Sequence, residues 1–358
     1  MNKKAVIAMS GGVDSSVAAA RMKEQGYDCI GVTMKLYDND MAGLAKGHTC
    51  CALDDVEDAK SVARRLKIPH YTFNFTADFE DGVIRPFAEA YLRGETPNPC
   101  IACNRHLKFD RLLRRARELE CDYIATGHYA RIDVADGRCR MRKAVDSSRD
   151  QSYVLYMLTQ DQLAHTLFPL GGLTKTEVRR LAEEQGFVNA RKHDSQDICF
   201  IPEGDYMAFL ERYTGREFPP GELVDEEGNR LGQCRNAAAY TIGQRRGLGL
   251  AAGRRRYVCG KSMADNTVTV GPERALFAKA VTAEDWNWIV PPPAKPFHAA
   301  ARVRYHQAET PVFVIPYPDG TVRLEFRGLQ RAPAPGPAAV LYDGDVVLGG
   351  GTINRAER

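Results

Sequence analysis

The stretch Ala8-Met9-Ser10-Gly11-Gly12-Val13-Asp14-Ser15-Ser16 separates two patterned segments. The apolar run at residues 5–8 predicts a short buried strand, and the alanine-rich run at residues 17–22 predicts a helix. A Gly-Gly turn therefore joins the carboxyl end of a strand to the N-terminus of a helix. Backbone N–H groups and the helix dipole converge at such a turn, so the stretch predicts an anion-binding loop.

The side chains of this loop narrow the class of ligand. Glycine lets a ligand approach the backbone closely, and serine hydroxyls can donate to phosphate oxygens. Asp14 is expected either to hold Mg²⁺ or to cap the helix. Neither a Walker A loop nor a dinucleotide fingerprint is present. Ser10-Gly-Gly-Val-Asp-Ser15 instead resembles the pyrophosphate loop of the N-type ATP pyrophosphatases, which adenylate a carbonyl or carboxyl oxygen.

Length, composition and charge limit the number of domains, the cellular location and the kind of partner. The 358 residues are 44% hydrophobic with a net charge of +3, which indicates two or three domains with a real core. No apolar run approaches a membrane span, and the N-terminus leads directly into a strand, so we expect a cytoplasmic protein without a signal peptide. Basic clusters at 111–117, 245–246 and 254–256 favour a polyanionic partner over merely solvated faces.

Up to about residue 205, short apolar runs alternate with helical patterns. Such alternation predicts βαβ units and a parallel sheet with helices on both faces. We expect strands at 28–36, 70–75 and 122–128, and helices at 54–66, 79–93, 104–119 and 174–185. Ligands of these sheets bind beyond the carboxyl ends of the strands. The glycine loop, Met34 and Gly127-His128 all fall at that edge.

After residue 205 the pattern becomes β-rich. A short helix at 206–213 is followed by turn signals at 226–229 and 264–266, which predict hairpins. Alternating runs up to the C-terminus predict a small antiparallel barrel or sandwich. The expected class is α/β: a doubly wound parallel sheet over residues 1–205, a central β-rich domain over 206–278 and a barrel-like domain over 279–358.

Three cysteines lie in or beside polar loops. Cys100 and Cys103 form a C-x-x-C before the helix expected at 104–119, whose dipole would lower the pKa of the Cys103 thiol. Cys199 lies at the junction of a polar loop and an apolar run. The three could be structural, could bind an iron–sulfur cluster or zinc with His106 or His193 as a further ligand, or could pass sulfur and form a transient disulfide. Spacing alone leaves these interpretations open.

Further motifs accompany the glycine loop along the chain. They are Thr96-Pro-Asn-Pro99 with Cys103-Asn104, Thr126-Gly-His-Tyr-Ala-Arg131, Arg149-Asp-Gln-Ser-Tyr153, Ile198-Cys199-Phe200-Ile201, Tyr240-Thr-Ile-Gly-Gln-Arg245, Arg304-Tyr305 and Tyr342-Asp-Gly-Asp345. Together with Ser10–Ser15 this set resembles the tRNA-specific 2-thiouridylase (MnmA) family over residues 5–353.

The resemblance implies ATP-dependent 2-thiolation of the wobble uridine of tRNA. ATP, with Mg²⁺, would adenylate the uracil 2-carbonyl, a persulfide on Cys199 would deliver sulfur, and the nucleophile Cys103 would complete the transfer through a transient Cys103–Cys199 disulfide. Asp14 is carried over as a catalytic residue. The implied ATP-binding residues are Ala8, Met9, Ser10, Gly11, Gly12, Val13, Asp14, Ser15, Met34 and Gly127.

The resemblance also implies two partners, tRNA and a persulfide donor such as a cysteine desulfurase or a sulfur relay protein. The target base must leave its stack to be reached. The residues expected to contact the base are Asn98, Pro99 and Cys100. Those expected to contact tRNA elsewhere are His128, Arg149, Asp150, Gln151, Arg304 and Tyr305.

Four positions depart from the family's usual pattern. Cys100 often has Asp in its place, and its thiol completes a potential iron–sulfur ligand set of Cys100, Cys103 and Cys199. Cys234 and Asn236 replace His and Gly in the central domain, and Pro337 replaces a Gln that often contacts tRNA. Two other functions compete with tRNA thiolation: small-molecule amidation, which needs neither the cysteine pair nor the β domains, and a non-catalytic metal-containing RNA-binding protein, which leaves the glycine loop unexplained.

Overall fold

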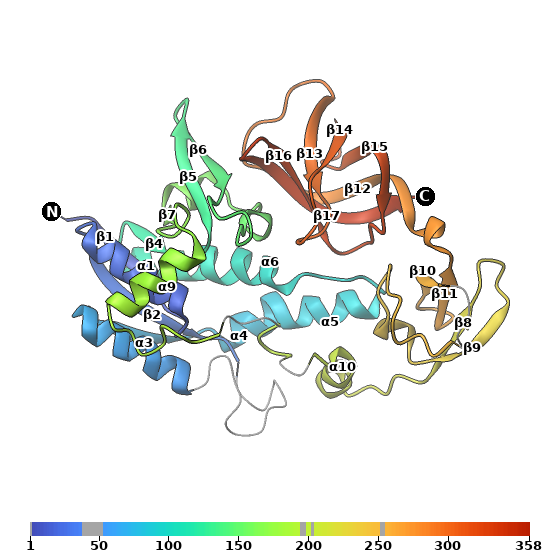
Figure 1. Cartoon of the computed structure of the whole chain (residues 1–358), viewed down its shortest axis with the longest axis horizontal. Coiled ribbons are helices and arrows are strands. Elements are labelled where there is room, and N and C mark those ends of the chain that lie inside the picture. Colours follow the sequence, from blue (N-terminus) through green and yellow to red (C-terminus); the bar gives the residue numbers. More distant parts are fainter. Residues whose placement is uncertain (1, 38–52, 194–197, 202–203, 251–254) are drawn as a thin grey trace. The chain divides into compact units, whose positions relative to one another are not determined.

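The computed structural model describes residues 2–37, 53–193, 198–201, 204–250 and 255–358 (Figure 1). The chain forms two compact units. Unit 1 comprises residues 1–84, 99–204 and 344–348, and unit 2 comprises residues 85–98, 205–343 and 349–358. The predicted domain boundaries at 205 and 278 stay predictions.

A five-stranded sheet organises unit 1. Its strands are β1 (Lys4–Ala8), β2 (Asp28–Lys35), β3 (His70–Asn74), β4 (Tyr123–Ala125) and β7 (Thr166–Leu167). They run in the order β3-β2-β1-β4-β7, and every pairing is parallel. The strand order reverses between β1 and β4, which makes their carboxyl ends the expected ligand crevice of the sheet. The parallel α/β architecture predicted from the alternating pattern is confirmed.

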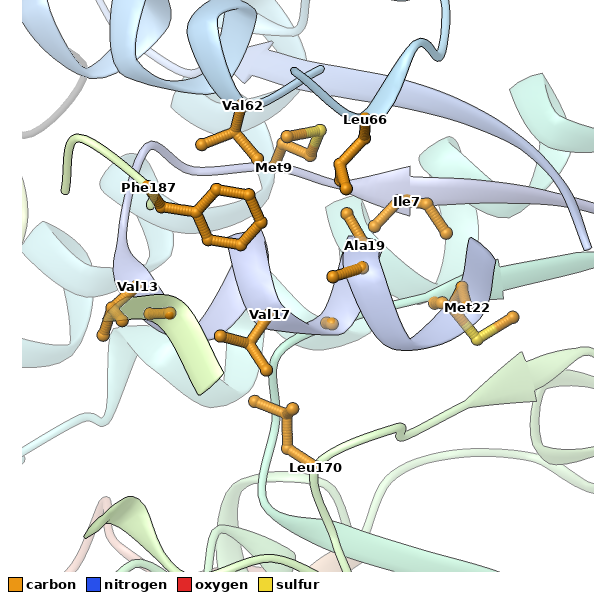
Figure 2. Packing of buried hydrophobic residues seen from close by; sticks show 14 of the residues in the cluster. Ile7, Met9, Val13, Val17, Ala19, Met22, Val62, Leu66, Leu170 and Phe187 are labelled. Atoms are coloured by element: carbon orange, nitrogen blue, oxygen red, sulfur yellow. The ribbon is translucent and has the colours of Figure 1, made fainter. Parts of the chain in front are cut away.

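Apolar faces attach the helices of unit 1 to this sheet. The helices include α1 (Val13–Glu24), α3 (Leu53–Leu66), α4 (Thr76–Phe79), α8 (Gln160–Ala164) and α9 (Lys175–Glu184), with a 3₁₀ turn at η3 (Ser152–Val154). Figure 2 shows Val62 and Leu66 of α3 near Met9 and Ile7, with Leu170 beside Val17 of α1. This packing buries both ends of the glycine loop, because Met9 and Val13 belong to the same core.

The segment around the C-x-x-C is helical earlier than predicted. One continuous helical stretch runs from α6 (Pro99–Cys103) through the π-helical η2 (Asn104–Arg111) into α7 (Leu112–Glu118). A similar π-helical segment, η1 (Glu80–Ile84), follows α4 and leads into α5 (Arg85–Leu92). The helix expected at 104–119 therefore begins at Pro99, where proline suits the first turn because its missing N–H has no intrahelical partner there.

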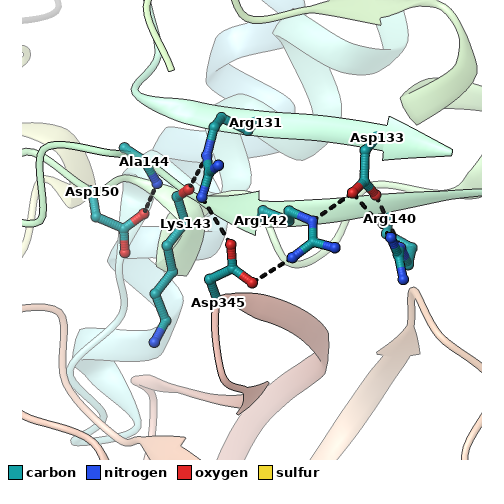
Figure 3. Close-up of polar contacts among 8 residues, drawn as sticks. All are labelled: Arg131, Asp133, Arg140, Arg142, Lys143, Ala144, Asp150 and Asp345. Atoms are coloured by element: carbon teal, nitrogen blue, oxygen red, sulfur yellow. Dashed lines mark hydrogen bonds and ion pairs between the residues drawn. The ribbon is translucent and has the colours of Figure 1, made fainter. Parts of the chain in front are cut away.

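A hairpin that the sequence pattern did not predict joins unit 1 to a turn near the C-terminus. Strands β5 (Ala130–Ala135) and β6 (Arg138–Lys143) pair antiparallel. Figure 3 shows the Asp345 carboxylate accepting from Arg131 at 2.8 Å and from Arg142 at 2.5 Å. Asp345 belongs to unit 1 with its neighbours 344–348, so this residue of the Tyr342–Asp345 motif stabilises the hairpin.

Unit 2 is mainly β-structure. Helix α10 (Tyr206–Thr214) precedes a sheet of β8 (Gly221–Val224), β9 (Arg230–Cys234), β10 (Tyr257–Ser262) and β11 (Thr267–Gly271), with short helices η4 (Ala237–Ala239) and η5 (Glu273–Leu276). Six further strands are β12 (Phe277–Trp288), β13 (Phe297–Arg302), β14 (Thr310–Pro316), β15 (Val322–Arg331), β16 (Ala338–Asp343) and β17 (Val346–Glu357). Pairing of β12 with β17 closes these six into a barrel, which confirms the small antiparallel barrel. Within the described ranges, every helix is too short or too polar to cross a lipid bilayer.

Lys261 on β10 places a charge inside unit 2. Its ammonium donates to the Tyr240 carbonyl at 2.8 Å, and burial lowers the pKa of Lys261 to about 8, against the opposing effect of Glu95. Between pH 8 and about 10.5 the unfolded chain holds a proton that the folded chain lacks, so stability rises with pH. The buried charge costs roughly 3 kcal/mol below pH 8, before its hydrogen bond offsets about 1 kcal/mol of that.

We therefore expect Lys261→Met to raise the free energy of unfolding at pH 7 by about 2 kcal/mol. The gain should shrink as the pH rises from about 8 to 10.5 and disappear above that range, where the wild-type lysine is neutral in both states. Denaturant titrations at several pH values measure both effects, with exposed Lys279→Met as the matched control. Equal pH profiles for wild type and Lys261→Met would contradict the assignment.

Candidate functional site

The glycine loop has a backbone that only glycine can adopt at its centre. Gly11 has a φ of +76°, and a Cβ built on it would lie 2.3 Å from the Asp55 carbonyl oxygen. Gly12 is the N-cap of α1, with extended backbone and no side-chain cap. The loop therefore leaves the first N–H groups of α1 without a side-chain cap, as an anion-binding loop requires.

The loop serines bond within the loop. Ser15 Oγ donates to the Gly12 carbonyl at 3.0 Å and accepts from the Ser10 N–H at 3.2 Å. Ser16 Oγ donates to the same carbonyl at 3.0 Å. The hydroxyl protons expected to face phosphate are thus engaged with Gly12 in the absence of ligand. They shape the loop, and donation to phosphate would require them to rotate.

Two side chains that were not predicted from the sequence, Asn189 and Lys192, stabilise the glycine loop or the residues packed against it. Buried Asn189 donates to the Gly11 carbonyl at 2.8 Å and to Ser16 Oγ at 2.9 Å. Lys192 forms ion pairs with Asp55 and Asp58, whose carboxylates raise the pKa of Lys192 despite the opposing effect of burial. Both residues follow α9 by a few positions, in a segment with no recognisable nucleotide motif, so composition and spacing gave no signal for them.

Asp14 is committed to an ion pair. Both of its carboxylate oxygens accept from the Lys175 ammonium at 2.8 Å, and the Tyr129 hydroxyl donates to Oδ1 at 2.8 Å. The prediction that Asp14 caps the helix is wrong, because Gly12 holds the cap position. Its carboxylate also does not fit a magnesium ligand in this arrangement, since a cation already occupies both oxygens. Lys175 is the first residue of α9, directly after the N-cap Thr174 of the Thr174–Glu177 capping box. The sequence predicted this capping box but not the ion pair of Lys175 with Asp14.

Gly127 brings the end of β4 against the same loop. A Cβ on Gly127 would lie 2.9 Å from the Asp14 carbonyl carbon and 2.9 Å from the Ser15 nitrogen. Met34 lies at the other side of β1, near the end of β2, and is partly exposed. The loop, Met34 and Gly127 therefore gather at the carboxyl ends of adjacent strands, the edge predicted for the ligand.

We expect Gly127→Ala to weaken ATP binding about tenfold or more, because the added methyl must displace loop backbone rather than a flexible side chain. Equilibrium binding of ATP measures the effect. Gly172→Ala is the control, because a Cβ there meets nothing within 4 Å. Equal affinities for the two variants would remove Gly127 from the nucleotide site.

Cys100 and Cys103 occupy the first turns of the continuous helical stretch. Cys100 is exposed and Cys103 is half-buried. Desolvation raises the pKa of the Cys103 thiol, and Lys108 only partly offsets it. The expected lowering of the Cys103 pKa is therefore wrong, and the helix begins four residues before Cys103 rather than directly after it.

Cys199 lies next to the carboxyl edge of β2. The hydroxyl of Tyr37, two residues after β2, donates to the Cys199 carbonyl at 2.6 Å. Phe200 is fully buried, with its ring 5.6 Å from that of Phe79 in α4. Tyr37, Phe79 and Phe200 thus fix the backbone of Cys199 within unit 1. Residues 194–197 of the preceding polar loop lie outside the described residues.

The two cysteine segments are connected through packed helices of the same unit. Segment η1 follows α4 directly, and a Cβ on Gly82 of η1 would lie 3.2 Å from His106 Cβ of η2. Segment α6, with Cys103, also packs on η1. In the part of the chain that is described, no three His, Cys, Asp or Glu side chains come close enough to hold a metal. Cys100, Cys103 and Cys199 therefore do not form an iron–sulfur ligand set in this conformation.

The residues expected to contact tRNA differ in exposure. His128 is buried beside Phe109 and Phe168, and its ring bonds Thr126 at 2.7 Å. Burial holds the pKa of His128 well below its usual value, with Lys108 adding to the effect, so the ring is neutral near pH 7. Its place in this cluster gives His128 a structural purpose.

The Arg149–Gln151 motif combines one exposed side chain with two structural ones. Arg149 is exposed. Buried Asp150 accepts from the Ala144 and Ser152 N–H groups, and Gln151 accepts from the Tyr129 N–H at 2.9 Å. The last two side chains therefore position the loop that presents Arg149.

The remaining predicted contacts lie in unit 2, apart from buried Pro99. Asn98 ends the segment 85–98 of that unit. Arg304 donates to the carbonyls of Ile242 at 3.0 Å and Ala332 at 2.6 Å, and the ring of Tyr305 lies against that of His306. Asn98 and Pro99 directly precede Cys100 in the chain. The tRNA contacts of Asn98, Pro99, Arg304 and Tyr305 stay predictions.

The unusual residues of unit 2 have local structural explanations. Cys234 is buried, and desolvation raises the pKa of its thiol. Asn236 caps η4 by accepting from the Ala238 N–H at 3.1 Å. Pro337 accepts from the Ile353 N–H at 2.9 Å through its carbonyl, which a proline can do as well as a glutamine.

A parallel sheet with a Ser-Gly-Gly-x-Asp-Ser loop at its switch point defines a nucleotide-binding α/β protein. Consistent with this, residues 3–203 match the family described as tRNA methyl transferase HUP domain. Residues 207–272 match its PRC-barrel domain, and residues 278–353 match the aminomethyltransferase beta-barrel domain. The chain belongs to the tRNA-specific 2-thiouridylase family, the name carried by its full-length relatives.

Among these relatives, the protein of Geotalea uraniireducens is 48% identical over 99% of this chain and 96% of its own length. That of Heliobacterium modesticaldum is 49% identical over 99% of this chain and 93% of its own. Similarity to solved structures is lower. A 4-thiouridine synthetase–RNA complex with bound ATP matches at 18% identity and a TM-score of 0.37, covering 60% of this chain and 54% of that chain.

Proposed function

We propose that this protein is an ATP-dependent tRNA uridine 2-sulfurtransferase that makes 2-thiouridine at the wobble position. The observation that carries the proposal is full-length identity of 48% to a relative named tRNA-specific 2-thiouridylase, with the glycine loop and both loop cysteines present. ATP is the nucleotide. Its phosphates would bind the N–H groups of the loop from Ala8 to Ser15, with Met34 and Gly127 flanking the site.

Adenylation turns the uracil 2-oxygen into a leaving group. The oxygen attacks the α-phosphorus of ATP, and pyrophosphate leaves toward the helix N-terminus, where developing negative charge is stabilised. Asn98, Pro99 and Cys100 would receive the base once it has left its stack. His128, Arg149, Asp150, Gln151, Arg304 and Tyr305 would bind or support the tRNA.

Sulfur transfer uses the two thiols in turn. The terminal sulfur of a Cys199 persulfide attacks carbon 2, and AMP leaves with the original oxygen. The Cys103 thiolate then attacks Sγ of Cys199, which forms the Cys103–Cys199 disulfide and releases the electron pair to the uridine sulfur. A persulfide donor protein loads Cys199, and a cellular dithiol reduces the disulfide.

The proposed mechanism has no step on Mg²⁺ or on an iron–sulfur cluster. Mg²⁺ would accompany ATP and neutralise phosphate charge, but Asp14 does not fit it while paired with Lys175, so no step is routed through the ion. An iron–sulfur cluster on Cys100, Cys103 and Cys199 would require these residues to move together, and no step uses one. Because tRNA and ATP are both available there, we propose that the protein works in the cytoplasm.

Mass analysis of tRNA nucleosides tests the proposal. Unmodified tRNA is incubated with the protein, ATP, Mg²⁺ and a cysteine desulfurase with cysteine, then digested to nucleosides. The expected product is 2-thiouridine, formed only when ATP is present. Adenylation of a small-molecule substrate without any thiolated nucleoside would support an amide-forming synthetase instead. Tight tRNA binding without ATP consumption would support a binding protein.

A further inference from the structure

The segment Gly94–Asn98, here called the strap, leads directly into the helix that carries Cys100 and Cys103. It belongs to unit 2, and the chain enters unit 1 at Pro99. Residues far along the chain contact this segment closely. Among the described residues, one such contact comes from the C-terminal barrel and another from the central sheet.

The barrel-side contact is backbone against backbone. The Thr96 N–H donates to the Pro335 carbonyl at 3.1 Å. Gly336 has a φ of +106°, and a Cβ on it would lie 2.6 Å from the Thr96 nitrogen and 2.9 Å from the Thr96 oxygen. No side chain larger than hydrogen is compatible with this approach, because neither partner atom is part of a flexible side chain.

The Pro335-Gly336-Pro337 turn is itself rigid. Gly336 donates to the Ile353 carbonyl at 2.9 Å, and Ile353 donates back to the Pro337 carbonyl at 2.9 Å. Both flanking prolines have a fixed φ. The turn is thus bonded to β17 of the barrel on one side and to the strap on the other.

The second contact comes from β10 and the turn after it. Gly94 has a φ of +83°, and a Cβ on it would lie 2.9 Å from Met263 Cγ and 3.5 Å from Lys261 Cε. Lys261 is fixed by its bond to the Tyr240 carbonyl. The strap is therefore held at Gly94 by side chains and at Thr96 by backbone, two to four residues before Asn98.

We propose that these contacts position the strap and its base-receiving residue Asn98, with Gly336 and Gly94 as positioning residues for thiolation. The inference rests on the proposed function and deepens it. Holding the backbone at residues 94–96 restricts the conformations of Asn98, which is two residues further along the chain. Loss of the contact lets that segment move, and small displacements of reacting groups are costly to rate.

Glycine substitutions with matched controls test the proposal. Gly336→Ala should lower kcat for tRNA thiolation about 10- to 100-fold and leave ATP affinity unchanged. Gly320→Ala is the control: it lies in the same barrel with a φ of +87°, yet a Cβ there meets nothing within 4 Å. Gly94→Ala, which meets the ends of flexible side chains, should have an intermediate effect. Gly228→Ala, also at +87° and open, is its control.

A second readout does not depend on activity. The rate at which Cys103 reacts with a small maleimide, followed by peptide mass analysis, should rise severalfold in Gly336→Ala and stay at the wild-type value in Gly320→Ala. Equal rates of tRNA thiolation and equal rates of Cys103 labelling in Gly336→Ala and Gly320→Ala would overturn the proposal that the strap has a positioning role. Failure of the wild type to thiolate tRNA overturns the proposed function instead, and the labelling comparison still decides whether the contacts of the strap restrain the chain that follows it.

Discussion

In a single turnover without thiol reductant, replacing Cys199 or Cys103 with serine should each lower the rate of tRNA thiolation at least about 1,000-fold, because a serine hydroxyl can neither carry a persulfide nor displace one. ATP binding should be unchanged, since neither thiol belongs to the glycine loop. Nucleoside mass analysis and equilibrium ATP binding measure the two quantities. Cys139→Ser is the matched control, because Cys139 is also half-buried but lies on the β5–β6 hairpin.

The two variants should fail at different steps. Cys199→Ser cannot load sulfur, so the tRNA is released unmodified. Cys103→Ser should stop after AMP has left, with tRNA joined to Cys199 through a disulfide. Without reductant this adduct should appear as a slowly migrating band that dithiothreitol removes, with thiolated tRNA as the product. Near wild-type thiolation by either variant would contradict the two-thiol mechanism, and an adduct in Cys199→Ser would reverse the order of the thiols.

The sequence predicted the parts of the fold that depend on local patterns. Alternating apolar and helical runs located β1, β2, β3 and β4, and turn residues located the hairpin tips at 226–229 and 264–266. The β5–β6 hairpin escaped prediction because its strands are rich in arginine, and their charges are balanced by Asp133 and the distant Asp345. The contribution of Asp345 lies about 200 residues away and cannot be read from any local window of sequence.

The residues of the candidate site likewise fall into those that local sequence predicted and those that depend on tertiary contacts. Ser10–Ser15 and Gly127 were identifiable because a nucleotide loop demands particular residues in one short stretch. Asn189 and Lys175 were not, because each acts on the loop from more than 150 positions away. The Cys103 pKa was misjudged for a related reason: a helix N-terminus can be read from sequence, whereas the desolvation that raises this pKa depends on the tertiary packing of α6.

The ion pair between Asp14 and Lys175 provides the other large expected effect. Lys175 is 8% exposed, and both Asp14 oxygens lie 2.8 Å from its ammonium. Lys175→Met removes the cation and leaves the Tyr129 hydroxyl bonded to the Asp14 carboxylate. We therefore expect a loss of about 3 kcal/mol in the free energy of unfolding, at the lower limit for buried pairs because Asp14 remains partly exposed. Pyrophosphate release should fall about 100-fold as the first turn of α1 shifts, and Asp14→Ala should lower it as well.

A double-mutant cycle separates the interaction energy of the Asp14–Lys175 pair from the separate effects of the two residues on stability. Asp14→Asn combined with Lys175→Met removes both charges, so the double variant should be more stable than either single variant. Arg180→Met is the control on the same helix, because its pair with Glu184 is exposed on both sides and should contribute at most about 1 kcal/mol. Recovery of stability without recovery of pyrophosphate release would mean that the charges act on ATP as well as on the fold. Additive losses in the cycle, or unchanged release in Asp14→Ala, would show that the pair does not organise the loop for catalysis.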